Sequence, residues 1–255
     1  MRNIWTICRK ELGSYFVSPI AYLLLTVSGV VSGFFFWVLL SGFVIEGMEM
    51  QMRGESFPMN INEQIIRPLL MNIGVIFLFF LPLITMRLFA EEKRSGTIEL
   101  LATSPVRDLE IILGKWFAAL TLYACMLLMP ALDFIFLFVY GKPDWKPVAV
   151  GYLGLLLLGG LFLAIGTFIS TLTKNQIIAA AVTFAVCLLL WVMEWTTNFE
   201  SGNWADVLGY ISVITHFDSF AKGVIESKDV VFYLTGIFVG LFATARSLES
   251  LRWRS

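Results

Sequence analysis

The sequence predicts an all-α, polytopic membrane protein with six transmembrane helices. Of its 255 residues, 58% are hydrophobic and only 15% are charged, and the mean hydropathy is +0.81. Soluble domains are about 45–50% apolar and about 25% charged. Six uncharged runs have the length that a helix needs to cross about 30 Å of hydrocarbon. Together these observations exclude a water-soluble globular domain, a disordered chain and a disulfide-stapled secreted module.

The apolar runs define the predicted spans. They cover about residues 20–45, 68–88, 113–140, 147–171, 175–195 and 230–247, so we expect residues 1–255 to form a single transmembrane domain. An even number of spans places both termini on one side of the membrane. Segments 1–19, 87–115, 171–176 and 246–255 carry 12 of the 18 Lys and Arg residues. The positive-inside rule therefore predicts cytoplasmic N- and C-termini.

An amphipathic helix is predicted before the first span. Apolar residues recur there at helical spacing, which is typical of a helix lying in the membrane interface. They are Ile4, Trp5, Cys8, Leu12, Tyr15 and Phe16, set against Arg2, Arg9, Lys10 and Glu11. The helix either positions the first span as an elbow or only anchors the chain. Ser18 and Pro19 then predict the start of the first span, with Ser as N-cap and Pro at the first helical position.

Small residues four positions apart occur in three spans. The pairs are Gly29 and Gly33, Gly160 and Ala164, and Gly236 and Gly240. Such spacing lets helix backbones approach closely in lipid. We interpret these pairs as packing sites within one chain, although a dimer interface is the alternative for each.

The 87–115 segment is the longest predicted cytoplasmic loop. It is charged at both ends and carries an apolar centre at Ile98, Leu100 and Leu101. Gly96 is expected to end the helix that runs in from the second span. Apolar residues ringed by charge indicate a docking site for a protein partner. The alternative is that the charges only keep a positive-inside loop in water.

Three stretches of the chain carry a family resemblance. The first is Glu91-Glu92-Lys93-Arg94-Ser95-Gly96-Thr97-Ile98-Glu99-Leu100-Leu101, followed by Ser104-Pro105-Val106 and Gly114-Lys115. The others are 159–176 and 211–225, with Asp229 and the residues after it. In this order they resemble the type-2 ABC exporter permeases. The last stretch is most similar to the gliding-motility (GldF-like) branch, with the nitrous-oxide-reductase maturation (NosY-like) permeases close by.

This resemblance implies a non-catalytic permease subunit of the bacterial inner membrane. It implies a coupling helix in the 91–105 region, two copies of a separate ABC ATPase subunit that carry ATP and Mg, and a second permease copy or a related permease. An accessory extracytoplasmic subunit is also compatible with it, whereas nothing indicates nucleic acid. The residues implied in ATPase coupling are Glu91, Glu92, Arg94, Gly96, Thr97, Ile98, Glu99, Leu100, Leu101, Ser104 and Pro105. The chain itself has no G-x-x-x-x-G-K-[ST] phosphate loop, so we expect no cofactor in it.

Few residues could carry chemistry within the spans. Asp133 is the one ionisable residue well inside a predicted span, so it is a candidate for the transport path. Glu194 lies at a predicted outer boundary, where water can solvate it. His216 is the only histidine, and we favour a structural hydrogen bond over a metal or acid–base role, since a lone His lacks partner ligands. The three scattered cysteines predict neither a disulfide nor a metal site.

Two other functions stay open at this stage. An ion-coupled channel or secondary transporter would use Asp133, and an ABC-type assembly or motility device would move no small solute. A membrane enzyme built on Asp133 and His216 is disfavoured because their predicted depths differ.

Overall fold

The computed structural model describes residues 2–54, 60–97, 106–141, 143–197 and 209–252, and it contains helices but no strand in these ranges. The helices are α1 (Arg2–Val17), α2 (Pro19–Arg53), the π-helical turn η1 (Asn62–Ile66), α3 (Arg67–Thr85), α4 (Ala90–Ser95), α6 (Asp108–Tyr140), α7 (Trp145–Ser170), α8 (Gln176–Thr197), α10 (Val213–Ala221) and α11 (Ser227–Arg252). Six segments are long and apolar enough to cross a membrane. The predicted all-α class with six spans is therefore confirmed.

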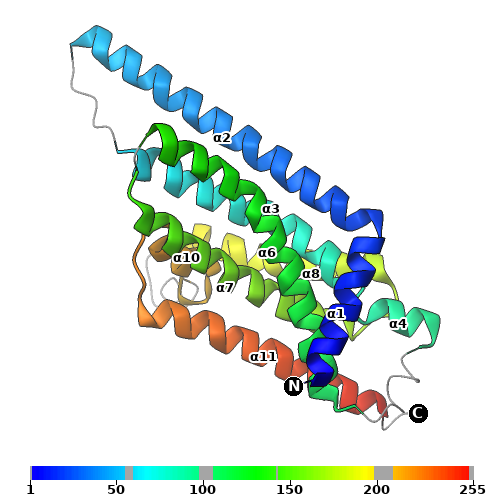
Figure 1. Ribbon diagram of the computed structural model, residues 1–255. Coiled ribbons are helices and arrows are strands. Elements are labelled where there is room, and N and C mark those ends of the chain that lie inside the picture. Colours follow the sequence, from blue (N-terminus) through cyan, green and yellow to red (C-terminus); the bar gives the residue numbers. More distant parts are fainter. Residues whose placement is uncertain (1, 55–59, 98–105, 142, 198–208, 253–255) are drawn as a thin grey trace.

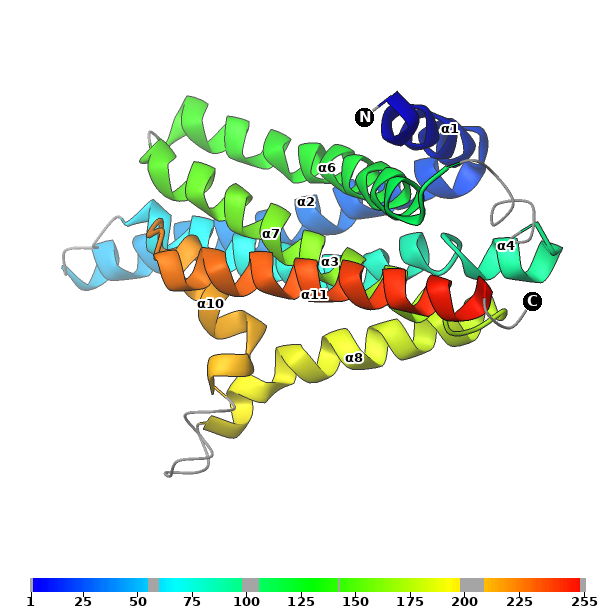
Figure 2. The same cartoon turned by 90° about the horizontal axis from the view of Figure 1, so that it is seen from below.

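The six long helices form an elongated bundle with two distinct ends (Figure 1). One end carries α1, α4 and the C-terminal part of α11, and the other carries η1 and α10 (Figures 1 and 2). α3 and α7 run through the middle, whereas α2 and α8 lie at the periphery. The N-terminal helix α1 and the C-terminal part of α11 therefore lie at the same end of the bundle, as an even number of spans requires.

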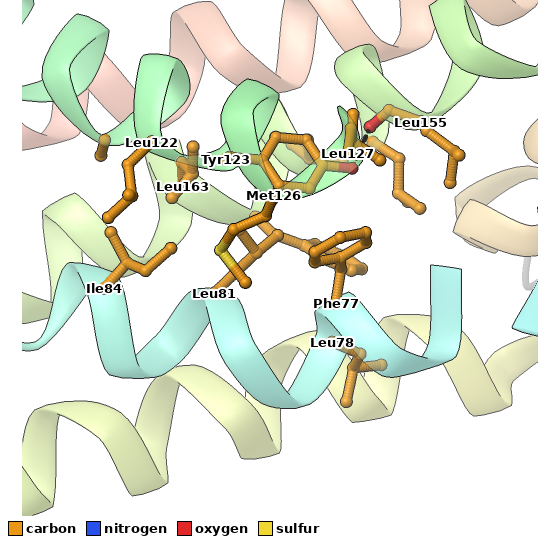
Figure 3. Close-up of a cluster of buried hydrophobic side chains, with 14 of the residues drawn as sticks. Phe77, Leu78, Leu81, Ile84, Leu122, Tyr123, Met126, Leu127, Leu155 and Leu163 are labelled. Atoms are coloured by element: carbon orange, nitrogen blue, oxygen red, sulfur yellow. Dashed lines mark hydrogen bonds between the residues drawn. The ribbon is translucent and has the colours of Figure 1, made fainter. Parts of the chain in front are cut away.

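The core lies where α3, α6 and α7 meet (Figure 3). Phe77 of α3 packs edge-on against Tyr123 of α6, with ring centroids 4.8 Å apart. The Tyr123 hydroxyl donates a 2.7 Å hydrogen bond to the Leu155 carbonyl of α7. A Cβ on Gly159 would lie 2.1 Å from the Tyr123 ring, so only glycine lets α7 approach α6 this closely. In lipid, such close packing and hydrogen bonding replace the hydrophobic effect as the force between helices.

Two of the small-residue pairs pack against each other. A Cβ on Gly236 of α11 would lie 2.6 Å from the Leu161 side chain of α7, and one on Gly240 would lie 3.0 Å from the Ala164 Cβ. The prediction that these pairs serve packing within one chain is therefore confirmed for α7 and α11. A Cβ on Gly33 of α2 would have no neighbour within 4 Å, so its pair does not pack in the same way.

Helix α2 begins as predicted but ends later. The Ser18 hydroxyl accepts from the backbone N–H of Ile20, and Pro19 follows at the first helical position. The predicted span stops at residue 45, whereas the helix continues to Arg53, where Glu49 and Arg53 lie one turn apart. At 1.5 Å per residue its 35 residues extend about 52 Å, well beyond the hydrocarbon thickness. Its buried residues form one stripe in its first half: Ala21, Leu24, Ser28 and Ser32.

Candidate functional site

Helix α1 packs across the start of α6. A Cβ on Gly114 would lie 2.8 Å from the Ile7 side chain, which shows how closely the two helices approach. Asn3 at one end of α1 donates a 3.0 Å hydrogen bond to the Glu110 carboxylate. At the other end, the Tyr15 hydroxyl donates to the Ile84 carbonyl of α3. Because burial raises the pKa of Tyr15 well above its ordinary value, this hydroxyl stays protonated and remains a donor.

The amphipathic pattern of α1 is divided between two faces. Cys8 and Tyr15 are buried against the bundle, with Leu12 packed beside them. Trp5 and Phe16, predicted on the same apolar face, are 69% and 36% exposed. The buried face of α1 therefore packs against the rest of the bundle, and Trp5 and Phe16 project away from this face. This arrangement supports the elbow interpretation over a mere anchor, since α1 is fixed to both α3 and α6.

Helix α4 is held by the end of α7. The Ser170 hydroxyl oxygen accepts from the backbone N–H groups of Phe89 and Ala90, at 3.1 and 3.0 Å, and so satisfies donors that the short helix leaves free. Gly96 ends α4 with φ of 74°, a left-handed conformation that favours glycine. The predicted helix end at Gly96 is confirmed, but the helix that it ends is the separate α4, because α3 of the second span already ends at Thr85. Ser170 itself is positioned by the close approach of Gly166 to Thr85, where a Cβ would lie 2.2 Å from the Thr85 hydroxyl oxygen.

Three charged residues, one each from α1, α4 and α6, contact one another. Lys115 of α6 places its Nζ 2.9 Å from Glu11 Oε1 of α1 and 2.8 Å from Glu92 Oε1 of α4. Its side chain is 3% exposed, and the two carboxylates are 18% exposed. The ammonium also lies 5.3 Å from the centroid of the Phe89 ring. We call Lys115, Glu11 and Glu92 the Lys115 cluster.

The Lys115 cluster makes these helices interdependent. A buried ammonium is tolerated only when charges or hydrogen bonds compensate for its lost hydration. Two carboxylates contact it, and each comes from a different helix. The second oxygen of Glu92 is buried and has no hydrogen-bond partner within the described residues. Displacement of α4 alone would therefore break the 2.8 Å contact between Glu92 and the buried Lys115 ammonium.

The structure places the predicted coupling residues in different surroundings. Glu91 pairs with Arg87 at 3.1 Å, and Glu92 points inward to Lys115. Arg94 and Thr97 are exposed at the tip of this end. The remaining predicted coupling residues lie outside the described residues, and their role stays a prediction. They are Ile98, Glu99, Leu100, Leu101, Ser104 and Pro105.

Asp133 lies in the second half of α6, facing neighbouring helices. Ser32 of α2 and Tyr152 of α7 are its polar neighbours. Asp133 Oδ2 is buried, and no hydrogen bond reaches it from the part of the chain that the structure describes. The Tyr152 hydroxyl donates instead to the Leu127 carbonyl, at 3.3 Å. This arrangement provides a carboxylate within the bundle but no cationic partner for it among the described side chains.

His216 lies at the opposite end of the bundle from the Lys115 cluster. It contacts Asp229 of α11 and the Tyr210 carbonyl, which agrees with the predicted structural hydrogen bond. Asp218, two positions further on, pairs instead with Arg67 and Lys222. Within the part of the chain that the structure describes, no group of three metal-ligating His, Cys, Asp or Glu side chains occurs.

The sequence did not indicate which residues pair in the Lys115 cluster, nor that His216 contacts Asp229. In the sequence, Lys115 is one basic residue of a cytoplasmic loop, and Glu11 is part of the polar face of the first helix. Their contact joins positions 104 residues apart, which periodicity within one helix cannot predict. Asp229 follows one of the stretches that carry the family resemblance, but the resemblance implies no role for it. Only Ser170 and Gly166 had a signal in the sequence: they are small residues at the predicted end of a span, where close packing is expected.

Comparison with known protein families now identifies the chain. A family model described as ABC-2 family transporter protein matches residues 52–220, which is well over half of the chain. The chain belongs to the ABC-2 transporter family. The match includes α4, the start of α6 with Lys115, and most of α10 with His216. A search of curated proteins gave no significant match.

Membership of the ABC-2 family supports the coarser predictions made above. An ABC-2 permease is the membrane subunit of a transporter and is not itself catalytic. The family also implies an ABC ATPase as partner and a multi-pass location in a membrane.

Proposed function

We propose that this ABC-2 protein is the permease subunit of an ATP-driven exporter, and that its α1 and α4 end converts ATPase closure into helix movement. The single observation that carries the proposal is the Lys115 cluster. Residues 98–105 connect α4 to α6 in the chain, and the cluster joins these same two helices through Glu92 and Lys115. A force on the connecting segment therefore acts on α4 and on α6, the two helices that the buried pair of Glu92 and Lys115 joins.

The route from this segment to the transmembrane helices follows from connectivity. Glu11 brings α1 into the same cluster, and α1 passes directly into α2 at Ser18 and Pro19. α2 has fewer fully buried residues than α3 or α7, so it can tilt with less loss of packing. In this mechanism α2 is the helix that moves when α4 is pushed, while the α3, α6 and α7 core stays packed.

The remaining features of the assembly are part of the same proposal. Two copies of an ABC ATPase would carry ATP and Mg, and a second permease copy or a related permease would complete the membrane part. We place the complex in the bacterial inner membrane, with α1 and the end of α11 in the cytoplasm. The gliding-motility or NosY-like branch and an accessory extracytoplasmic subunit also belong to the proposal.

Affinity purification tests this function directly. The tagged chain, extracted in mild detergent from its native membranes, should co-purify with an ABC ATPase and show ATP hydrolysis. Leu100→Glu should abolish the association by placing a charge at the predicted apolar docking centre. Ile225→Glu is the matched control, since Ile225 is 54% exposed beside α10 at the opposite end. A chain that elutes without ATPase, or that loses the ATPase equally in both variants, would contradict the proposal.

A second candidate function rests on Asp133. Its buried and unpartnered Oδ2 suits an ion-coupled channel or secondary transporter that binds a cation at this depth. Asp133→Asn would abolish ion-coupled transport but would leave ATP-driven transport in place. Transport assays with this variant therefore discriminate between the two functions.

A further inference from the structure

The only histidine of the chain is enclosed between α10 and the start of α11. His216 is 3% exposed, and its Nδ1 lies 2.6 Å from Asp229 Oδ1. Its Nε2 lies 2.9 Å from the backbone carbonyl oxygen of Tyr210. The imidazole stacks on Phe232 with ring centroids 4.0 Å apart, and the Tyr210 ring meets its edge. Both ring nitrogens therefore face an oxygen at hydrogen-bonding distance.

This geometry determines how many protons the site must hold. A backbone carbonyl and an ionised carboxylate can only accept hydrogen bonds, and a neutral imidazole has one N–H. A neutral His216 beside an ionised Asp229 would therefore leave one nitrogen lone pair facing an oxygen. One additional proton removes the conflict, either as an imidazolium that donates from both nitrogens or as a carboxylic acid that donates to Nδ1.

Burial of Asp229 supports the same conclusion. Its side chain is 1% exposed, and Oδ2 has no hydrogen-bond partner among the residues described. An ionised carboxylate in this position requires a compensating cation. The group in contact with its other oxygen is His216. The pair is thus compensated when the extra proton is present and carries a buried negative charge when it is absent.

We propose that His216 and Asp229 form a proton-dependent clasp that holds α10 against α11. The retained proton fixes the 2.6 Å contact between the two helices and the contact to Tyr210 that precedes α10. Loss of this proton leaves a lone pair opposite an oxygen, and α10 loosens from α11. The clasp lies at the end opposite α1 and α4, and it does not depend on the proposed ATPase.

Other charged groups near the clasp have partners of their own. On α11, the Tyr233 hydroxyl donates to the Val213 carbonyl, and Lys228 pairs with Glu226. On α10, Asp218 binds Lys222 and also Arg67 of α3. Among the described residues, Glu194 of α8 is a further acidic neighbour and lies near Asp218. α7 packs on α10 through Gly154, where a Cβ would meet Phe220.

Nuclear magnetic resonance of the ring nitrogens tests the proton count. Since the chain has one histidine, ¹⁵N-histidine labelling of the purified protein in detergent gives one unambiguous pair of signals. At neutral pH the proposal predicts two N–H signals, or one at Nε2 with Nδ1 accepting from the carboxylic acid. A neutral ring with its hydrogen on Nδ1 and a bare Nε2 would overturn the proposal.

Hydrogen exchange of the α10 amides tests the clasp. After correction for intrinsic exchange rates, protection of residues 213–221 should fall about tenfold or more when the clasp loses its proton, the size expected for a charge-assisted hydrogen bond. Asp229→Asn should remove this fall in protection. The Asn amide N–H donates to Nδ1 while Nε2–H donates to the Tyr210 carbonyl, so both contacts form without an additional proton. Asp218→Asn is the matched control on α10 and should keep the fall in protection. In the wild-type protein, protection that does not change when the clasp loses its proton would overturn the proposal.

Discussion

Replacement of Lys115 by methionine is the strongest perturbation that the site offers. Methionine has a similar length but no charge, so the substitution leaves Glu11 and Glu92 facing each other without the ammonium that lies 2.9 and 2.8 Å from them. Removing one partner of a buried ion pair costs about 3–5 kcal/mol, because the remaining charge stays buried. We therefore expect Lys115→Met to lower the free energy of unfolding by about that amount.

Neutralising the whole cluster should restore most of this loss. In the triple variant Glu11→Gln, Glu92→Gln, Lys115→Met, no uncompensated charge remains, and replacing complete buried ion pairs by neutral groups is often neutral or stabilising. We expect its stability to return to within about 1–2 kcal/mol of wild type. Lys10→Met on the exposed side of α1 is the control, with an expected effect within about 0.5 kcal/mol.

Reversible unfolding in mixed micelles by titration with a denaturing detergent measures these differences. The reasoning would be refuted by a Lys115→Met variant as stable as Lys10→Met. It would also be refuted by a triple variant no more stable than Lys115→Met alone, since the cost would then come from lost packing and not from unpaired carboxylates.

The remaining predictions concern the core, α4 and the intramembrane carboxylate. Gly159→Ala should destabilise the protein by about 1–3 kcal/mol or more, because its Cβ would lie 2.1 Å from Tyr123, whereas Gly33→Ala has open space and should not; thermal unfolding of both variants measures this. Ser170→Ala should raise amide hydrogen exchange in α4 by about fivefold, as loss of about 1 kcal/mol of capping predicts, and unchanged exchange would contradict the capping role. Asp133→Asn should leave ATP-driven transport within about twofold of wild type in proteoliposomes, and complete loss would favour the ion-coupled alternative.

Much of the bundle could be predicted from the sequence because local rules determine it. Run lengths indicated the six spans, and Ser18 with Pro19 indicated the start of α2. Gly96 marked the end of α4 because a left-handed residue there favours glycine. The small-residue spacing indicated close packing, although only the structure shows that α7 and α11 are the helices that meet. Each of these features depends on residues within a few positions of one another.

The features that could not be predicted depend on distant residues or on exposed helix. Lys115 is an ordinary basic residue at a span boundary until Glu11 and Glu92 are seen around it. Hydropathy did not predict the extension of α2 to Arg53, because the added residues are helical but include charged and polar side chains that lower the mean hydropathy. His216 and Asp229 are 13 positions apart across a turn, a spacing that no single helix period brings together. Long-range charge pairing therefore limited prediction more than helix placement did.

Site-specific photocrosslinking tests most directly whether the α1 and α4 end receives the ATPase. A photoreactive amino acid at Arg94 or Thr97, both exposed beside Gly96, should form an adduct with an ABC ATPase in native membranes. The same probe at Tyr140, which is 76% exposed at the opposite end of α6, should not. Adducts from Arg94 and Thr97 alone are the result that the account predicts. An ATPase adduct from Tyr140, or none from Arg94 and Thr97 in a complex that still co-purifies with the ATPase, would contradict it.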